Sequence, residues 1–177
     1  MKARSQSQSA QRRNPRQQRA PARARVGLVM GRDMDYGGLP NAESIFAEMG
    51  VRLAPMSCAD TPHGVDAPGT NLTVLPTADV SDIMEKSVAG VVVPGGATPG
   101  ASEASTFTKL IATTRAEGLP IMAFGEGVPR TLGSLGLETD RVLPRGVLLQ
   151  DEDVRLLDTA DDVREAVSAF IGEGAAA

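Results

Sequence analysis

The feature that most constrains the fold is a series of short, fully apolar runs that alternate with segments of helical spacing. Two of these runs end in glycine-rich turns. Val91–Val93 precedes a Pro-Gly-Gly turn at 94–96, and Ile121–Phe124 precedes a Gly-Glu-Gly turn at 125–127. Short runs without polar alternation are typical of strands that are buried on both faces of a parallel sheet. The helical segments between them then act as crossovers of β-α-β units.

The same periodicity predicts the remaining elements. Strands are expected over residues 26–30, 51–54, 89–93, 121–124, 147–150 and 154–157, with a small edge strand or hairpin arm over 72–75. Helices are expected over residues 41–49, 80–86 (capped by Asp79), 103–117, 128–135 and 161–171. Residues 56–70 are rich in Pro, Gly, Asp and Ser and are predicted to form a loop. The predicted fold class is α/β, a flavodoxin-like doubly wound parallel sheet in a three-layer α/β/α sandwich.

Charge divides the chain of 177 residues into two parts. Residues 1–25 hold eight Lys and Arg and no acid, whereas the rest of the chain holds 10 basic and 22 acidic residues. The first part has no aliphatic side chain larger than Ala after Met1, so it is predicted to be a disordered basic tail. The domain is expected over residues 26–172, followed by a flexible C-terminus at 173–177.

The tail has two interpretations. In the first, it is a solubilising extension or the product of a misassigned start codon. In the second, it makes loose contacts with nucleic acid or with an acidic surface, this domain's own included. Without aromatic residues, nucleic acid is expected to bind only non-specifically through the tail.

The chain lacks an apolar run of 18 residues, so no membrane span is expected. The single cysteine, Cys58, cannot form an internal disulfide, which indicates a reducing compartment, and a cytoplasmic location is predicted. With His63 as the single histidine, one chain cannot assemble a Cys/His zinc site. No metal and no cofactor are predicted.

Three glycine-bearing segments follow predicted strands, at 31–38, 95–96 and 125–127. In sheets of this class ligands bind beyond the carboxyl ends of the strands. The candidate ligand-binding residues are therefore Gly95, Gly96, Gly125, Glu126, Gly127, Asp33 and Asp35.

Residues 91–96 and 118–127 resemble the ThiJ/PfpI (class I glutamine amidotransferase-like) superfamily. Its members carry an apolar strand ending in Pro-Gly-Gly, and a Gly-Lys-Pro strand ending in Ala-Ile-Cys-His-Gly. The resemblance covers about residues 26–172 and implies a homodimer. It places the family's nucleophilic cysteine on Gly125, the following histidine on Glu126 and an upstream acidic residue on Gly38. The resemblance therefore implies the architecture of a site whose reactive groups are absent.

A closer likeness lies within that superfamily. Residues 72–96, 125–127 and 162–171 look like the C-terminal domain of large-subunit catalases, which lacks the cysteine nucleophile and serves stability or assembly. Peroxide chemistry is not implied, because a catalase barrel needs several hundred further residues.

Two side chains are candidates for catalysis. Glu126 is either a general acid/base or a carboxylate that stabilises a helix N-terminus through its dipole or as a cap. Cys58 is either part of a dyad with His63 or a free thiol that is exposed or half-buried. Glutamine hydrolysis by a Cys-His-Glu triad is not expected, because no histidine follows His63.

The leading hypothesis is a catalytically degenerate ThiJ/PfpI-like domain, a pseudoenzyme, that acts in interaction, assembly or small-ligand binding in a stress-related setting. Its expected partners are a second copy, another protein and a small anionic ligand. The alternative is a hydrolase or glyoxalase-like enzyme that uses Glu126 or Cys58 together with Asp33 or Asp35. A third hypothesis is anion or nucleotide binding at residues 125–127, where a helix is expected to begin.

Overall fold

The computed structural model describes residues 24–31, 40–58, 64–66, 72–95, 104–137 and 145–171. Five residues of the sequence analysis lie outside these ranges: Asp33, Asp35, Gly38, His63 and Gly96. Most of the predicted basic tail and the predicted flexible C-terminus are likewise outside the described part of the chain.

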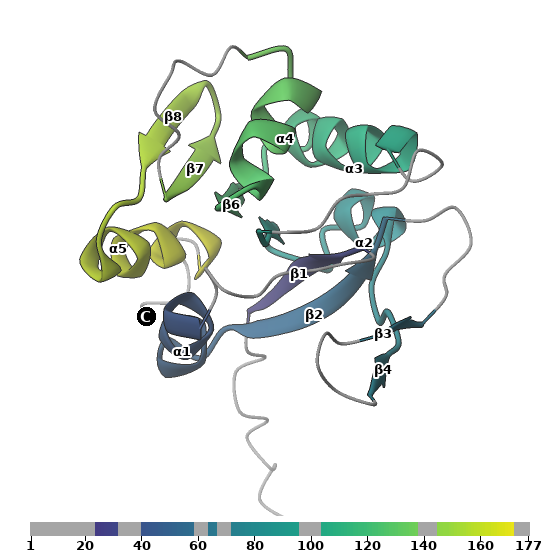
Figure 1. The fold of residues 1–177 in the computed structure, drawn as a ribbon, viewed down its shortest axis with the longest axis horizontal. Coiled ribbons are helices and arrows are strands. Elements are labelled where there is room, and N and C mark those ends of the chain that lie inside the picture. The colour runs from purple at the N-terminus through teal and green to yellow at the C-terminus, as the bar shows by residue number, and fades with distance from the viewer. Residues whose placement is uncertain are drawn as a thin grey trace, which may run out of the picture.

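A six-stranded sheet in the order β2-β1-β5-β6-β7-β8 forms the centre of the molecule (Figure 1). Its strands, in chain order, are β1 (Arg25–Met30), β2 (Arg52–Ser57), β5 (Val91–Val93), β6 (Ile121–Phe124), β7 (Gly146–Gln150) and β8 (Asp153–Leu156). Within the described ranges, five helices accompany the sheet: α1 (Pro40–Glu48), α2 (Val80–Met84), α3 (Ala104–Ala116), α4 (Gly127–Ser134) and α5 (Ala160–Ile171). The predicted fold class is confirmed.

The sheet has a parallel and an antiparallel part. Strands β2, β1, β5 and β6 pair in parallel, as predicted. The two late strands, β7 and β8, instead run antiparallel to their neighbours. Only Asp151 and Glu152 connect them, and a two-residue connection can join antiparallel strands but not a parallel crossover. Asp151 has a φ of 54°, the left-handed conformation that such tight turns require.

Helices cover both faces of the sheet, because successive side chains of a strand point to opposite faces. On one face, strand residues such as Val91 and Val93 pack with α2, α3 and α4. On the other face, Val92 and its neighbours pack with α1 and α5. There the rings of Phe46 and Phe170 meet edge to face with their centroids 5.8 Å apart. Figure 1 shows α1 beside α5, and α3 beside α4.

The prediction of a loop over residues 56–70 is wrong at two places, the start of the segment and residues 65–66 within it. Strand β2 extends to Ser57, because it pairs with β1 along its whole length. Val65–Asp66 forms a strand, β3, that pairs antiparallel with β4 (Thr73–Val74), the predicted hairpin arm. Pairing with neighbouring chain segments here overrides a composition rich in turn-forming residues.

Helix α2 begins as its sequence predicts. The Asp79 carboxylate accepts a hydrogen bond from the Ser81 backbone N–H, and Asp82 accepts one from the Asp79 N–H. This capping box satisfies backbone donors at the start of the helix.

No helix in the described part of the chain is long and apolar enough to cross a membrane.

Candidate functional site

The turn between β6 and α4 is the centre of the candidate site. Gly125 directly follows the strand with a φ of +50°, a conformation that side chains disfavour and glycine tolerates. Its N–H donates to the Arg145 carbonyl at 3.0 Å, and its carbonyl accepts from the Val128 N–H at 3.1 Å. The chain thus passes from strand to helix in a sharp, hydrogen-bonded turn, which is the architecture that the resemblance implied.

Gly125 and Gly127 are glycines for different reasons. Among the described residues, a Cβ at Gly125 would approach only the Gly95 Cα, at an ordinary contact distance of 3.6 Å, so the backbone conformation is the constraint there. A Cβ at Gly127 would lie 2.6 Å from the Pro94 carbonyl oxygen and 3.0 Å from a Val93 methyl group. Gly127 therefore lets the first turn of α4 pack directly on the end of β5. The prediction that the turns at Gly95 and Gly125 come together is confirmed.

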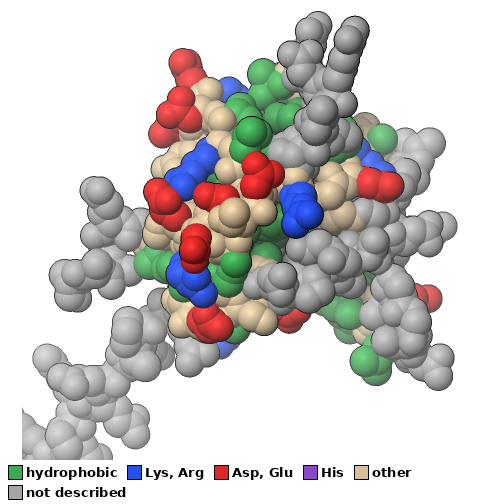
Figure 2. Space-filling model, turned by 60° about the vertical axis from the view of Figure 1, so that its left-hand side comes forward, with side chains coloured by type: hydrophobic (Ala, Val, Ile, Leu, Met, Phe, Trp, Pro, Cys, Tyr) green, Lys and Arg blue, Asp and Glu red, His purple; other side chains and the backbone are tan. Residues whose placement is uncertain are grey.

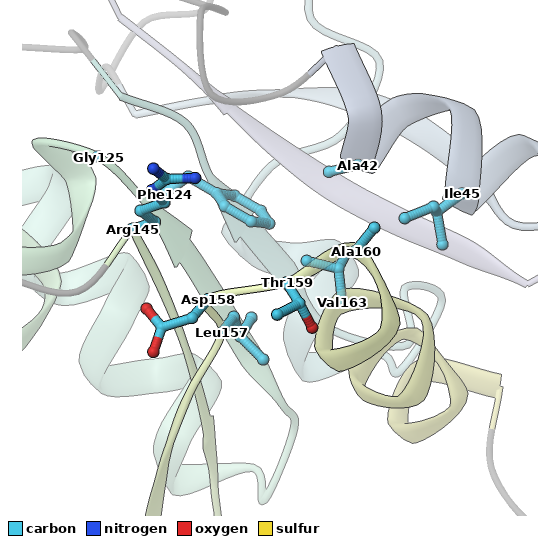
Figure 3. A pocket seen from close by; sticks show the side chains of 10 residues that line it. All are labelled: Ala42, Ile45, Phe124, Gly125, Arg145, Leu157, Asp158, Thr159, Ala160 and Val163. Carbon is cyan, nitrogen blue, oxygen red and sulfur yellow. The ribbon is translucent and has the colours of Figure 1, made fainter.

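A cavity of about 410 Å³ opens beside Gly125, at the carboxyl ends of the parallel strands (Figure 3). Its walls come from the end of β6, the residue before β7, the β8–α5 connection and the first turns of α1 and α5. The lining residues are Ala42, Ile45, Phe124, Gly125, Arg145, Leu157, Asp158, Thr159, Ala160 and Val163.

The sequence analysis missed the charged residues of this cavity, Arg145 and Asp158. Both reach it because β7 and β8 are antiparallel to their neighbours, so that β7 starts and β8 ends at the edge of the sheet where β6 ends. The signal was present in the sequence. The three residues between the predicted late strands, 151–153, favour a hairpin over a parallel crossover, and a hairpin places residues 145 and 158 close together.

Glu126 occupies the N-cap position of α4, but its side chain makes no capping hydrogen bond. It is exposed and does not line the cavity. Burial lowers the pKa of Arg130, one turn further along the helix, and the negative charge of Glu126 opposes this shift. Of the two structural roles predicted for Glu126, the side-chain cap is wrong, because the residue itself adopts a helical conformation.

Cys58 forms no disulfide but is buried, with 2% of its surface exposed, so the prediction of an exposed or half-buried thiol is wrong in its burial. It directly follows β2, and its thiol donates to the Met30 carbonyl oxygen at 3.0 Å. The thiol packs in the core on the α2–α4 face of the sheet. The apolar wall of the cavity belongs to the α1–α5 face, and Cys58 is not among the lining residues.

Side chains at the start of α5 cap this helix. The Asp162 carboxylate accepts from the Thr159 N–H at 2.9 Å, the Thr159 hydroxyl at 2.7 Å and the Asp158 N–H at 3.2 Å. The Asp162 N–H donates in return to the Thr159 hydroxyl oxygen at 3.2 Å. Hydrogen bonds from the Thr159 side chain and backbone hold the pKa of Asp162 below its ordinary value of 3.8. The Thr159 hydroxyl is thus part of a helix cap.

No set of three or more His, Cys, Asp or Glu side chains among the described residues is placed to hold a metal ion. The run of acids at 151–153 forms the exposed end of the β7–β8 hairpin, as a solvated turn would.

The sequence matches no known family model and no curated protein. Solved structures do match. A mutant of a DJ-1 superfamily protein from Salmonella typhimurium aligns with a TM-score of 0.56 at 15% identity, over 81% of this chain and 86% of that one. Oxidized DJ-1 from Toxoplasma gondii aligns with a TM-score of 0.53 at 17% identity, over 84% and 89%.

A ThiJ/PfpI family protein from Pseudomonas syringae aligns with a TM-score of 0.51 at 15% identity, over 85% of this chain and 68% of that one. These matches support the predicted ThiJ/PfpI resemblance. At such identities the likeness concerns the fold, so the chain has the α/β fold of the DJ-1/ThiJ/PfpI structures.

Proposed function

We propose that this protein is a catalytically degenerate domain that binds a small ligand in the cavity beside Gly125. The observation that carries the proposal is a cavity of about 410 Å³ at the ligand-binding edge of the fold, with glycine where the resemblance places a nucleophile. This volume falls in the range of about 300–1,000 Å³ that is usual for small-molecule sites.

The chemistry of the lining residues supports binding without covalent catalysis. Among the described residues that line the cavity there is no thiol, and the one hydroxyl, on Thr159, is engaged with Asp162 in the cap of α5. Covalent catalysis needs a nucleophile within hydrogen-bond reach of a base that activates it. Six of the lining side chains are apolar: Ala42, Ile45, Phe124, Leu157, Ala160 and Val163.

A thermal-shift screen of small metabolites tests the proposal, with a variant that fills the cavity. Ala160 is exposed, lines the cavity and is the first residue of α5, so Ala160→Trp places a large ring in the binding space. Ala104→Trp is the matched control, because Ala104 is also exposed and is the first residue of α3. A ligand at about 100 times its Kd raises Tm by roughly 5–10 °C in a domain of this size.

We expect hits that stabilise the wild type and Ala104→Trp but not Ala160→Trp. Hits that persist in Ala160→Trp would place binding elsewhere, and the lack of any hit would contradict a ligand-binding role. Hydrolase or glyoxalase turnover that Glu126→Gln abolishes would contradict the degenerate character and favour the enzyme.

A further inference from the structure

The cavity beside Gly125 is divided into a charged end and an aliphatic end (Figure 3). Arg145 and Asp158 lie at the end next to Gly125, whereas Ala42 and Ile45 of α1 lie at the opposite end. Val163 of α5 faces the aliphatic end. A ligand that fills the cavity therefore has a charged head near Gly125 and an apolar tail directed toward α1.

Hydrogen bonds between neighbouring strands align Arg145 and Asp158 with Gly125. The Gly125 N–H donates to the Arg145 carbonyl at 3.0 Å, and the Leu157 N–H donates to the Gly146 carbonyl at 2.9 Å. Continued by one residue, this register sets Arg145 between Gly125 and Asp158. Neighbouring strands are about 4.7–4.9 Å apart, so a small head group spans the distance between the two side chains.

These two charges are not used within the described part of the chain. Charged side chains on the adjoining α1–α5 surface pair with one another, as Arg155 does with Glu165 at 2.5 Å and Arg164 with Asp161 at 3.0 Å. Figure 2 shows this surface, where blue and red side chains lie close together. Arg145 and Asp158 have no ion-pair partner among the described residues, although they carry opposite charges and line the same cavity.

We propose that the cavity binds a free α-amino acid with an apolar side chain, and this inference rests on the proposed function. The guanidinium of Arg145 receives the carboxylate, because its planar fork matches that group. The Asp158 carboxylate receives the ammonium group, and the aliphatic side chain extends toward Ile45 and Val163. A ligand with a single charge would leave one of the two protein charges desolvated and unpaired, which weakens its binding.

Isothermal titration with three compounds that share one branched aliphatic group tests the charge requirement. L-Leucine carries both charges, 4-methylpentanoate lacks the ammonium group, and 3-methylbutylamine lacks the carboxylate. We expect leucine to bind the wild type, and each single-charge analogue to bind at least about tenfold more weakly, the usual effect of losing a charged hydrogen bond.

Two variants that each remove one charge and keep a polar side chain assign the two roles. Arg145→Gln is expected to weaken leucine binding at least about tenfold and to remove the preference for leucine over the amine. Asp158→Asn is expected to weaken it similarly and to remove the preference for leucine over 4-methylpentanoate. Arg52→Gln and Asp153→Asn, exposed positions outside the cavity lining, are the matched controls and should bind leucine as the wild type does.

The outcomes separate this inference from the proposed function. Equal binding of leucine and 4-methylpentanoate would overturn the inference and define the site as one for simple anions. Failure of L-leucine, L-methionine and L-phenylalanine to bind, while the screen yields other hits that Ala160→Trp abolishes, would also overturn the inference but leave the proposed function standing. Loss of every hit from the screen would refute both.

Discussion

Helices α4 and α5 each follow a turn that lines the cavity, and they begin differently. Helix α5 starts with a reciprocal side-chain cap between Thr159 and Asp162. Helix α4 starts at Gly127 after an N-cap residue, Glu126, whose side chain makes no capping hydrogen bond. The first start is held by polar side chains, and the second is held by close packing of its backbone on the end of β5.

This difference shows which side of the cavity is structural and which is open. The cap of α5 satisfies backbone donors that would otherwise face the cavity. At the start of α4 the chain makes a tight glycine turn, and Gly125 of this turn lines the cavity. The β6–α4 turn therefore shapes the site, whereas the β8–α5 connection secures a helix and supplies the Asp158 charge.

The largest effect is expected from Gly127→Ala. The new methyl group would lie 2.6 Å from the Pro94 carbonyl oxygen, which belongs to a buried backbone segment and cannot move away cheaply. We expect the free energy of unfolding to fall by about 2–3 kcal/mol, the usual cost of overpacking a core, as measured by urea denaturation.

Gly133→Ala is the matched control for this substitution. Gly133 lies in the same helix and is exposed, and a Cβ at this position would meet no atom within 4 Å. Alanine should stabilise the helix there by about 0.5–1 kcal/mol. Destabilisation of equal size at both positions would show that backbone packing of α4 on β5 does not hold this turn.

A smaller effect is expected at the other helix start. Thr159→Ala removes the hydroxyl that accepts from the Asp162 N–H and donates to its carboxylate. Loss of an N-cap of this kind lowers the free energy of unfolding by about 1 kcal/mol, again measured in urea. An unchanged urea midpoint would mean that the cap does not contribute to the stability of the domain.

The pH dependence of Asp162 provides an independent check of the same cap. The pKa of this carboxyl is lowered in the folded state, mainly by the Thr159 hydroxyl. Its contribution to stability is therefore fully present above the ordinary value of 3.8 and is lost as the pH falls through the lower, folded value. Between about pH 6 and about pH 2.5, Asp162→Asn should lose less stability than the wild type.

The smallest effect is expected from Glu126→Gln. The side chain is exposed and makes no capping hydrogen bond, so only its charge is removed. The free energy of unfolding should change by less than about 0.5 kcal/mol, as is usual for surface positions. A loss of more than about 1 kcal/mol, the usual value of a helix cap, would show that Glu126 stabilises α4 despite the missing hydrogen bond.

Much of the fold was predictable from local patterns. The strand at 121–124 has the bounds that its apolar run predicted, and Asp79 caps α2 as expected. The meeting of the turns at Gly95 and Gly125 was also predictable, because parallel strands end at one edge of a sheet. These features depend on side-chain periodicity and on turn chemistry within a few residues.

The burial of Cys58 could not be predicted from the residues around it in the sequence. Its surroundings are rich in turn-forming residues, yet the thiol is buried, because β2 extends to Ser57 along β1 and carries Cys58 to the Met30 carbonyl. That placement depends on a strand 28 positions away in the sequence.

The sequence by itself determined the alternation of strands and helices and the glycines that shape the turn at Gly125. Only the tertiary structure decided that Arg145 and Asp158 line the cavity, because the pairing of β7 with β6 sets the β7–β8 hairpin at the edge where β6 ends. Periodicity reports which face of an element is buried. Sheet order and strand direction, set by packing between distant segments, determine which side chains meet.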